Sequence, residues 1–350
     1  MPIELTTTRH NPGIDPTLHV WGWEIPVYLF LGGLVAGLMI IAGVRLVLVQ
    51  PRERQAMVCC TIGPLVGLTL LSLGMLALFL DLSHKLYVWR LYLTFQITSP
   101  MSWGSWILLL VYPALLANAL THLPEAIPSV ARRFHAFVAI SDFILARPRV
   151  VIGIGLANIV VGVALGLYTG ILLSALPARP LWNTAILGPL FLFSGLSTAA
   201  ALLHGILVLS FKDGERPAFA DFLLSSLARW SEGRAPDTRI APLLTQADNS
   251  FLTVELGLLI LFLLGMVSST AASQQAAALL LTGPYAAPFW VLVIGSGILA
   301  PLTLQYLELQ NRIRHTLAPA VLVLVGGLTL RFILVFAGQE SHWARVASLP

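Results

Sequence analysis

Long apolar runs are the feature that most constrains this chain of 350 residues. A helix needs about 20 mostly apolar residues to cross the hydrocarbon core of a bilayer. Because only helices and closed barrels satisfy every backbone polar group in lipid, runs of this length predict membrane-spanning helices. Eight runs occur, at about residues 24–48, 57–80, 102–120, 149–176, 185–210, 250–270, 288–308 and 317–338. The sequence therefore predicts an all-α integral membrane protein with eight transmembrane helices.

Composition agrees with lipid as the solvent, because 57% of the residues are hydrophobic and only 10% are charged. An ordinary soluble domain has about a quarter charged residues. Two stretches between the runs are too polar to cross a membrane. Segment 125–148 carries arginines around an apolar stripe, which predicts an amphipathic helix on the membrane surface. Segment 211–249 is expected to be a solvated cytoplasmic loop, and residues 1–350 form one membrane domain.

The distribution of Lys and Arg predicts the orientation of the chain. Positive residues are retained on the cytoplasmic side of a membrane protein. The face that follows the first, third, fifth and seventh runs holds fourteen: Arg45, Arg52, Arg54, Arg132, Arg133, Arg147, Arg149, Lys212, Arg216, Arg229, Arg234, Arg239, Arg312 and Arg314. The opposite face, with both termini, holds Arg9, Lys85, Arg90, Arg179 and Arg345. Both termini should therefore face the periplasm.

Glycines recur four residues apart in several runs. Gly33 and Gly37, Gly63 and Gly67, and the series Gly162, Gly166, Gly170 follow this spacing. Small residues at this spacing let membrane helices approach closely, so they predict helix packing. The functional alternative is a conduit or hinge for a substrate.

The chain offers no set of residues for a metal cofactor. Cys59 and Cys60 are adjacent, which fits neither a cluster-binding pattern nor a disulfide framework. A membrane haem needs histidines that face each other at bilayer depth, yet His204 is the only histidine well inside a run. We therefore expect no haem, iron–sulfur cluster or metal in this chain. Any redox carrier should be diffusible and lipid-soluble.

Polar residues inside the runs gather near one side of the membrane. Such residues are costly in lipid and mark functional sites. At about 1.5 Å per residue, the outer third of the membrane holds Trp23, Glu24, Tyr28, Asp81, Ser102, Trp103, Tyr168 and Arg331, with His84 one turn beyond Asp81. Their hydrogen-bonding groups suit a quinone ring, which needs partners at both carbonyls and a proton acceptor. Asp81, His84 and Tyr28 are the candidates for proton transfer.

Each of these residues also has a structural interpretation. Trp21, Trp23 and Tyr28 fit an interfacial aromatic belt, and Asp81 fits a helix end in contact with water. Arg331 would either extend outward to water or pair with Asp81 or a neighbouring carboxylate.

A second set of polar residues lies deeper in the runs. Glu255, near the cytoplasmic start of the sixth run, would begin a proton path with Asn118, Asn158 and His204. The structural alternative for His204 is a hydrogen-bonded packing residue.

Several motifs resemble one known family. They are Trp21-Gly-Trp-Glu-Ile-Pro-Val-Tyr28, Asp81-Leu82 with Ser99-Pro-Met-Ser-Trp-Gly104, Gly166-Leu-Tyr168 with Pro180-Leu-Trp182-Asn183, and Arg331 with Ala337-Gly-Gln339. In their order and spacing they are similar to the NrfD/PsrC family, the quinone-interacting membrane subunits of polysulfide reductase, nitrite reductase and related complexes.

The resemblance implies two four-helix bundles with menaquinone or ubiquinone bound near the periplasmic face. It also implies a docked ferredoxin-like iron–sulfur subunit there, and a further catalytic subunit with molybdopterin, multihaem cytochrome or similar. The quinone-pocket candidates carried over by position are the Tyr28 motif, Asp81 and the Tyr168 motif. Where the polysulfide-reductase branch has histidine, this chain has Tyr28, so proton acceptance would shift to Asp81 or His84. The expected location is the inner membrane of a bacterium or archaeon, among lipids and without nucleic acid.

Two other classes of function stay open on the sequence. A secondary transporter would show inverted repeats or spans broken near the midplane. The prolines Pro26, Pro64, Pro189 and Pro301 lie too near the span ends to indicate this. A plain membrane anchor for a catalytic subunit would need neither Arg331 nor the outer polar cluster.

Overall fold

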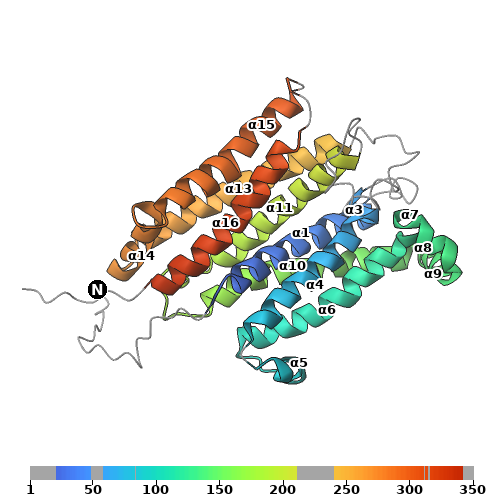
Figure 1. Cartoon of the computed structure of the whole chain (residues 1–350), viewed down its shortest axis with the longest axis horizontal. Coiled ribbons are helices and arrows are strands. Elements are labelled where there is room, and N and C mark those ends of the chain that lie inside the picture. The colour runs from blue at the N-terminus through green and yellow to red at the C-terminus, as the bar shows by residue number, and fades with distance from the viewer. Residues whose placement is uncertain are drawn as a thin grey trace, which may run out of the picture.

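The structure is a computed structural model that describes residues 21–48, 58–82, 84–210, 240–310, 312–313 and 316–341. All regular secondary structure within these residues is helical (Figure 1). Eight candidate membrane spans occur among them: α1 (Glu24–Leu48), α4 (Gly63–Asp81), α6 (Pro100–Thr121), α10 (Pro148–Ser174), α11 (Leu187–Ser210), α13 (Ile240–Val267), the π-helix η2 (Pro288–Leu299) continued by α15 (Ala300–Leu309), and α16 (Ala318–Glu340). The predicted fold class is confirmed.

Short helices connect the spans at both ends. They are α3 (Val58–Thr61), η1 (Lys85–Tyr87), α5 (Trp89–Leu93), α7 (Leu123–Ala126), α8 (Pro128–Arg133), α9 (His135–Leu145) and α14 (Ala271–Leu281). The segment expected as one amphipathic helix over 125–148 is divided between the end of α7, α8 and α9. Pro124 and Pro128 lie in the first turns of α7 and α8, where proline starts helices but cannot continue them.

Helix α13 begins earlier than the sequence suggested. Residues 240–249, expected in the cytoplasmic loop, form its first turns, and the rest of that loop, 211–239, lies outside the described residues. The polar residue Asp248 in this stretch is buried and accepts a hydrogen bond from the Ser197 hydroxyl at 2.7 Å, so it lies inside the bundle. A polar residue inside a bundle is thus part of the span.

Helix α1 occupies a central position. It packs against α4 and α10, and also against α11 and α16. Figure 1 shows α4 and α6 on one side of it and α13 with α15 on the other. The division into two four-helix bundles stays a prediction, because α10 and α11 also pack against each other across the middle.

Glycines permit the closest helix contacts. A Cβ on Gly37 would collide with the Gly195 carbonyl of α11, and a Cβ on Gly195 would collide with the Gly33 carbonyl. A Cβ on Gly170 would collide with the Leu187 carbonyl. The interpretation of the glycine spacing as helix packing is confirmed, since no other residue type allows backbones to come this near.

The two described ends of the chain meet at one end of the molecule. The Trp21 N–H donates to Gln339 Oε1 and the Gln339 amide donates to the Trp21 carbonyl, both at 3.0 Å. The Trp21 ring packs on Trp182, whose indole N–H donates to the Leu334 carbonyl at 2.7 Å. We call this end, which also holds Asp81, the outer end, after the predicted orientation, and the opposite end the inner end.

Candidate functional site

Three phenols converge near the outer end. Tyr28 of α1 and Tyr168 of α10 are only 3% and 5% exposed, and Tyr28 interacts electrostatically with Tyr168 and with Tyr92 of α5. The Tyr168 ring lies against Gly104 of α6, where a Cβ would collide with it. Helices α1, α5, α6 and α10 therefore build one tyrosine cluster, consisting of Tyr28, Tyr92 and Tyr168.

Tyr92 was not foreseen from the sequence. Burial raises the pKa of its phenol above the ordinary value, and the nearby Tyr112 raises it further. The phenol is therefore a hydrogen-bond donor at neutral pH. The one sequence signal was its place in an aromatic stretch between two spans.

Two acidic residues meet at the rim of the same end. Asp81 is the last residue of α4, and its carboxylate interacts electrostatically with Glu24 at the start of α1 and with Lys85. Asp81 is partly exposed, so it can exchange protons with water. The structure thus brings Glu24 and Asp81 together, as the sequence predicted for the outer third of the membrane.

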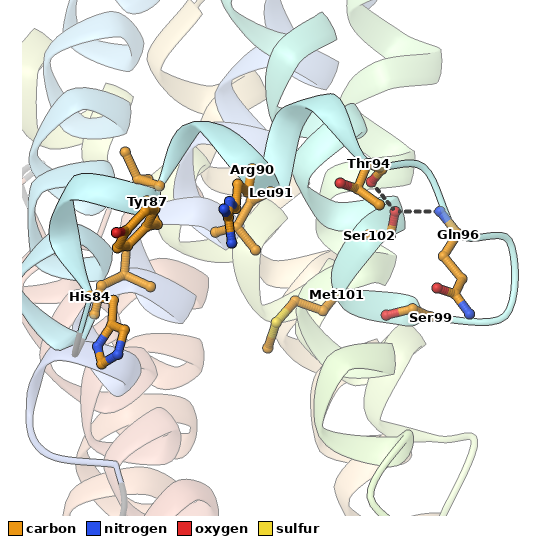
Figure 2. Close-up of a pocket in the computed structure, with 11 residues that line it drawn as sticks. His84, Tyr87, Arg90, Leu91, Thr94, Gln96, Ser99, Met101 and Ser102 are labelled. Carbon is orange, nitrogen blue, oxygen red and sulfur yellow. Dashed lines mark hydrogen bonds between the residues drawn. The ribbon is translucent and has the colours of Figure 1, made fainter.

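A pocket of about 520 Å³ opens beside these groups, between η1, α5 and the start of α6. Its polar lining includes His84, Arg90, Gln96 and Ser102, and its apolar lining includes Leu91 and Met101 (Figure 2). Small-molecule sites typically measure about 300–1,000 Å³ and combine an apolar wall with a few polar groups. Size and lining both fit a small amphipathic ligand.

Ser102 and Trp103 hold the wall of this pocket in place. The Ser102 hydroxyl accepts from the Gln96 N–H at 2.9 Å and donates to the Thr94 carbonyl at 3.2 Å. The Trp103 indole donates to the Ile97 carbonyl at 2.8 Å. Ser102 lines the pocket, whereas Trp103 fixes the connection that forms its wall.

The pocket and the tyrosine cluster lie on either side of α5. Leu91 lines the pocket, while the next residue, Tyr92, interacts with Tyr28. The lining does not include Tyr28, Asp81 or Tyr168. Of the residues singled out from the sequence, His84 and Ser102 therefore belong to the pocket itself, and the others at this end lie around it.

Trp23 belongs to neither group. It is 52% exposed at the start of α1. Its position fits the interfacial aromatic belt, where an indole lies between water and lipid.

Arg331 lies elsewhere, between α11 and α16. Its guanidinium donates to the Ser194 hydroxyl at 2.6 Å and to the Phe191 carbonyl at 3.2 Å. Its electrostatic partner is Glu255 of α13, whereas Asp81 interacts with Glu24 and Lys85. Pairing of Arg331 with Asp81 is therefore wrong. The carboxylate that interacts electrostatically with Arg331 is that of Glu255.

Asp248 extends this set into a buried carboxylate network. Its two carboxylate oxygens accept hydrogen bonds from Ser197 of α11 and Gln305 of α15, and it interacts electrostatically with Glu255. Asn118 and Asn158, expected on one path with Glu255, lie instead between α6 and α10, where the Asn158 amide donates to the Ala114 carbonyl. The polar residues of the predicted path therefore form separate groups.

Potential metal ligands stay scattered through the part of the chain that the structure describes. Residues 21–48, 58–82, 84–210, 240–310, 312–313 and 316–341 contain no group of three or more His, Cys, Asp or Glu placed to hold an ion.

Similarity to known proteins assigns this fold to a family. The family described as "Polysulphide reductase, NrfD" matches residues 8–341. The chain belongs to this family. It is 30% identical to the C subunit of polysulfide reductase from Wolinella succinogenes, over 91% of this chain and 94% of that protein. It is 29% identical to protein NrfD of Escherichia coli, over 91% and 95%, and 26% identical to a protein NrfD homolog of Haemophilus influenzae, over 97% and 99%.

Membership of the NrfD family has a direct consequence for this chain. It is a multi-pass membrane subunit of the kind found in oxidoreductase complexes, and the names of its relatives imply partner subunits. The match covers all eight candidate spans, so the whole membrane domain is of this type.

Proposed function

We propose that this NrfD-family chain is the membrane subunit of a respiratory oxidoreductase complex that oxidises quinol or reduces quinone at its outer end. The outer end faces the periplasm in this proposal, and the membrane is the inner membrane of a bacterium or archaeon. Electrons are exchanged with a docked ferredoxin-like iron–sulfur subunit, which connects to a catalytic subunit carrying molybdopterin, multihaem cytochrome or a similar centre.

The observation that carries the proposal is the pocket beside the tyrosine cluster. A quinone head needs a flat apolar surface, hydrogen-bond donors for its carbonyls and a proton acceptor nearby. Leu91 and Met101 supply apolar surface, and His84, Arg90 and Gln96 supply polar groups. Asp81 and Glu24 stand at the rim as proton acceptors.

In this proposal the residues of the outer end bind the ring, support the pocket or transfer protons, according to where they lie. His84 and Gln96 hold the carbonyl oxygens of the bound ring, and menaquinone or ubiquinone supplies the two-electron chemistry. Tyr28 and Tyr168 are buried on the other side of α5, where Tyr28 interacts with Tyr92. This contact holds α5, which forms one wall of the pocket, in position. Asp81 takes up the protons of a quinol and passes them to water at the rim, or supplies them in the reverse reaction.

Exposed apolar side chains next to the pocket support a docked partner or a lipid contact there. Leu86, Leu93 and Ile97 are strongly exposed, and the Arg90 guanidinium lies over the Tyr87 ring at 4.8 Å. A site next to the docking surface keeps the distance to the partner's first cluster short.

Asp81→Asn in the complex purified from native membranes tests the proposal. Asparagine keeps the shape of the side chain but cannot accept a proton, so quinol turnover should fall by about 10²-fold or more, as for other removed proton acceptors. The measurement is steady-state quinol oxidation or quinone reduction, with iron–sulfur absorbance of the copurified partner as a check on assembly.

Asp142→Asn is the matched control, since Asp142 is an exposed aspartate on α9 at the inner end. Its turnover should equal that of the unmodified complex. Unchanged turnover in Asp81→Asn would remove Asp81 from the mechanism. A purified chain without any iron–sulfur partner would argue against the electron-transfer role as a whole.

A further inference from the structure

Asn118 of α6 is a buried amide whose side chain has no partner among the described residues. Its side chain is 0% exposed, and neither its Nδ2 nor its Oδ1 has a hydrogen-bond partner among the described residues. Burying an unpaired amide costs several kcal/mol at membrane depth. Polar residues inside membrane spans mark functional sites because they are costly there. Internal water is the usual hydrogen-bond partner of buried polar groups that have none in the protein.

Asn158 of α10 lies beside it. Its Nδ2 donates to the Ala114 carbonyl of α6 at 2.9 Å, while its Oδ1 is buried without a partner among the described residues. In an α-helix the Ala114 carbonyl also accepts from the backbone N–H of Asn118. The two amides therefore adjoin, and three of their four side-chain polar atoms have no hydrogen-bond partner among the described residues.

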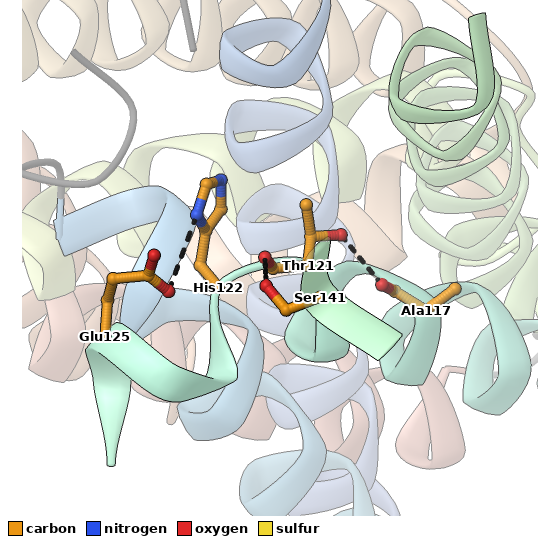
Figure 3. A network of polar contacts seen from close by, with 5 residues as sticks. All are labelled: Ala117, Thr121, His122, Glu125 and Ser141. Atoms are coloured by element: carbon orange, nitrogen blue, oxygen red, sulfur yellow. Dashed lines mark hydrogen bonds and ion pairs between the residues drawn. The ribbon is translucent and has the colours of Figure 1, made fainter. Parts of the chain in front are cut away.

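The polar column continues to the inner end of the molecule. His122, one turn beyond Asn118, closes α6 and places its Nδ1 4.0 Å from the Glu125 carboxylate (Figure 3). The Glu125 side chain is 21% exposed, so the column reaches the surface there. Ser141 of α9 donates to the Thr121 carbonyl at 2.7 Å and fixes this mouth against the surface helix.

Toward the outer end the same face of α6 becomes apolar. Leu115, Val111 and Leu108 follow Asn118 at successive turns and are all buried. Leu115 packs against Gly67 of α4. Beyond this layer, at the outer end of α6, Gly104 contacts the tyrosine cluster. The polar column thus ends beneath an apolar layer about two turns thick.

We propose that Asn118, Asn158, His122 and Glu125 line a hydrated proton inlet, which opens at the inner end of the molecule and is closed by Leu108, Val111 and Leu115. Water held by the two amides connects to the surface through His122 and Glu125. Hydrophobic constrictions of this kind gate conduction because water does not fill them. The inlet therefore takes up protons from the inner side without letting them leak to the outer side, whichever substrate the outer pocket binds.

Single cysteines along α6 in the assembled complex test the inlet. Cys59 and Cys60 are first replaced by alanine, and Asn118→Cys and Val111→Cys are introduced separately. A small cationic methanethiosulfonate reacts with the thiolate, which forms only where water reaches the sulfur. Asn118→Cys should react when the reagent is on the inner side, and Val111→Cys should stay unreacted.

Leu116→Cys is the control for reagent that enters through lipid, because Leu116 is an exposed, lipid-facing residue of the same helix. It should not react. The inlet is disproved if Asn118→Cys reacts no faster than Leu116→Cys. Reaction of Val111→Cys from the inner side would contradict a gate at that level.

Proton flux across liposomes tests the gate separately. The double variant Val111→Asn/Leu115→Asn should make a pH gradient collapse several-fold faster than in the unmodified complex, because it extends the polar column through the apolar layer. The matched variant Leu110→Asn/Leu116→Asn carries the same change on the lipid-facing side of α6. It should not speed the collapse of the pH gradient. Equal flux in the two variants would overturn the gate. Quinol turnover is measured in parallel, so that a failure here is distinct from a failure of the proposed redox function.

Discussion

Arg331 and Glu255 are 1% and 4% exposed, and their opposite charges interact electrostatically inside the membrane domain. Ser194 links them, since its hydroxyl accepts from Arg331 and its side chain is hydrogen-bonded to Glu255. Removing one of two buried, interacting charges leaves the other uncompensated, which is more costly than removing both. The pair is therefore a structural element of α11, α13 and α16.

A double-mutant cycle tests this pair. Glu255→Gln alone should destabilise the protein by about 1–3 kcal/mol, because the buried guanidinium loses the negative charge with which it interacts. Arg331→Met alone should destabilise the protein by a similar amount, because it leaves the Glu255 carboxylate uncompensated. The double variant should lose less stability than the two single variants together. The measurement is thermal unfolding in detergent. Additive losses would show that the two charges do not interact.

The depth of Arg331 could be predicted from the sequence, but its partner could not. Depth follows from counting residues along one span, whereas Glu255 lies in a different span far along the chain. The same limit applies to Tyr92, whose contact with Tyr28 joins a short surface helix to a distant span. Pairing between helices depends on how they rotate and cross, which no single run of sequence contains.

At the scale of helices, the close contact between α1 and α11 can be tested directly. A Leu at Gly37 would force its side chain into the Gly195 carbonyl, and overpacking of this kind costs about 1–3 kcal/mol. Gly37→Leu should therefore lower the unfolding temperature of the purified protein. Separation of α1 from α11 would also shift the Tyr28 end of α1, so quinol turnover should fall with it.

Gly153→Leu is the control for the loss of a glycine. Nothing lies within 4 Å of a Cβ at Gly153, and the residue is exposed on α10. Because leucine is a better helix former than glycine, its unfolding temperature should stay equal or rise. If both variants behave alike, close packing is not what the glycines provide.

The spans were predictable because hydropathy depends on composition alone. The predicted boundary was wrong where polar residues face inward, as at the start of α13. A helix as short as α5 has too few residues to show a periodic pattern. Helix α14 also escaped prediction, since its run Ala271–Leu281 is too short to span a membrane and mixes glutamines with alanines. Lipid as the solvent requires the spans to be helices, so their type could be predicted. The residues at which each helix begins and ends depend on packing against other helices.

At the scale of the whole molecule, the two ends of the described chain lie together at the outer end. An even number of spans requires this, whatever the compartment. Among the described residues, the outer end exposes Lys85 and Arg90 on the η1–α5 connection, while the inner end carries four arginines around α9: Arg132, Arg133, Arg147 and Arg149. By the positive-inside rule, this charge difference predicts that α9 faces the cytoplasm.

Two matched substitutions measure this orientation directly. Arg90→Cys and Arg147→Cys each place a thiol at an exposed position, one at each end, in the chain with Cys59 and Cys60 replaced. A membrane-impermeant maleimide should label Arg90→Cys in intact spheroplasts and Arg147→Cys only after permeabilisation. Since the redox proposal needs its pocket on the periplasmic side and the proton inlet needs its mouth on the cytoplasmic side, the reversed labelling pattern would contradict the compartments assigned to both.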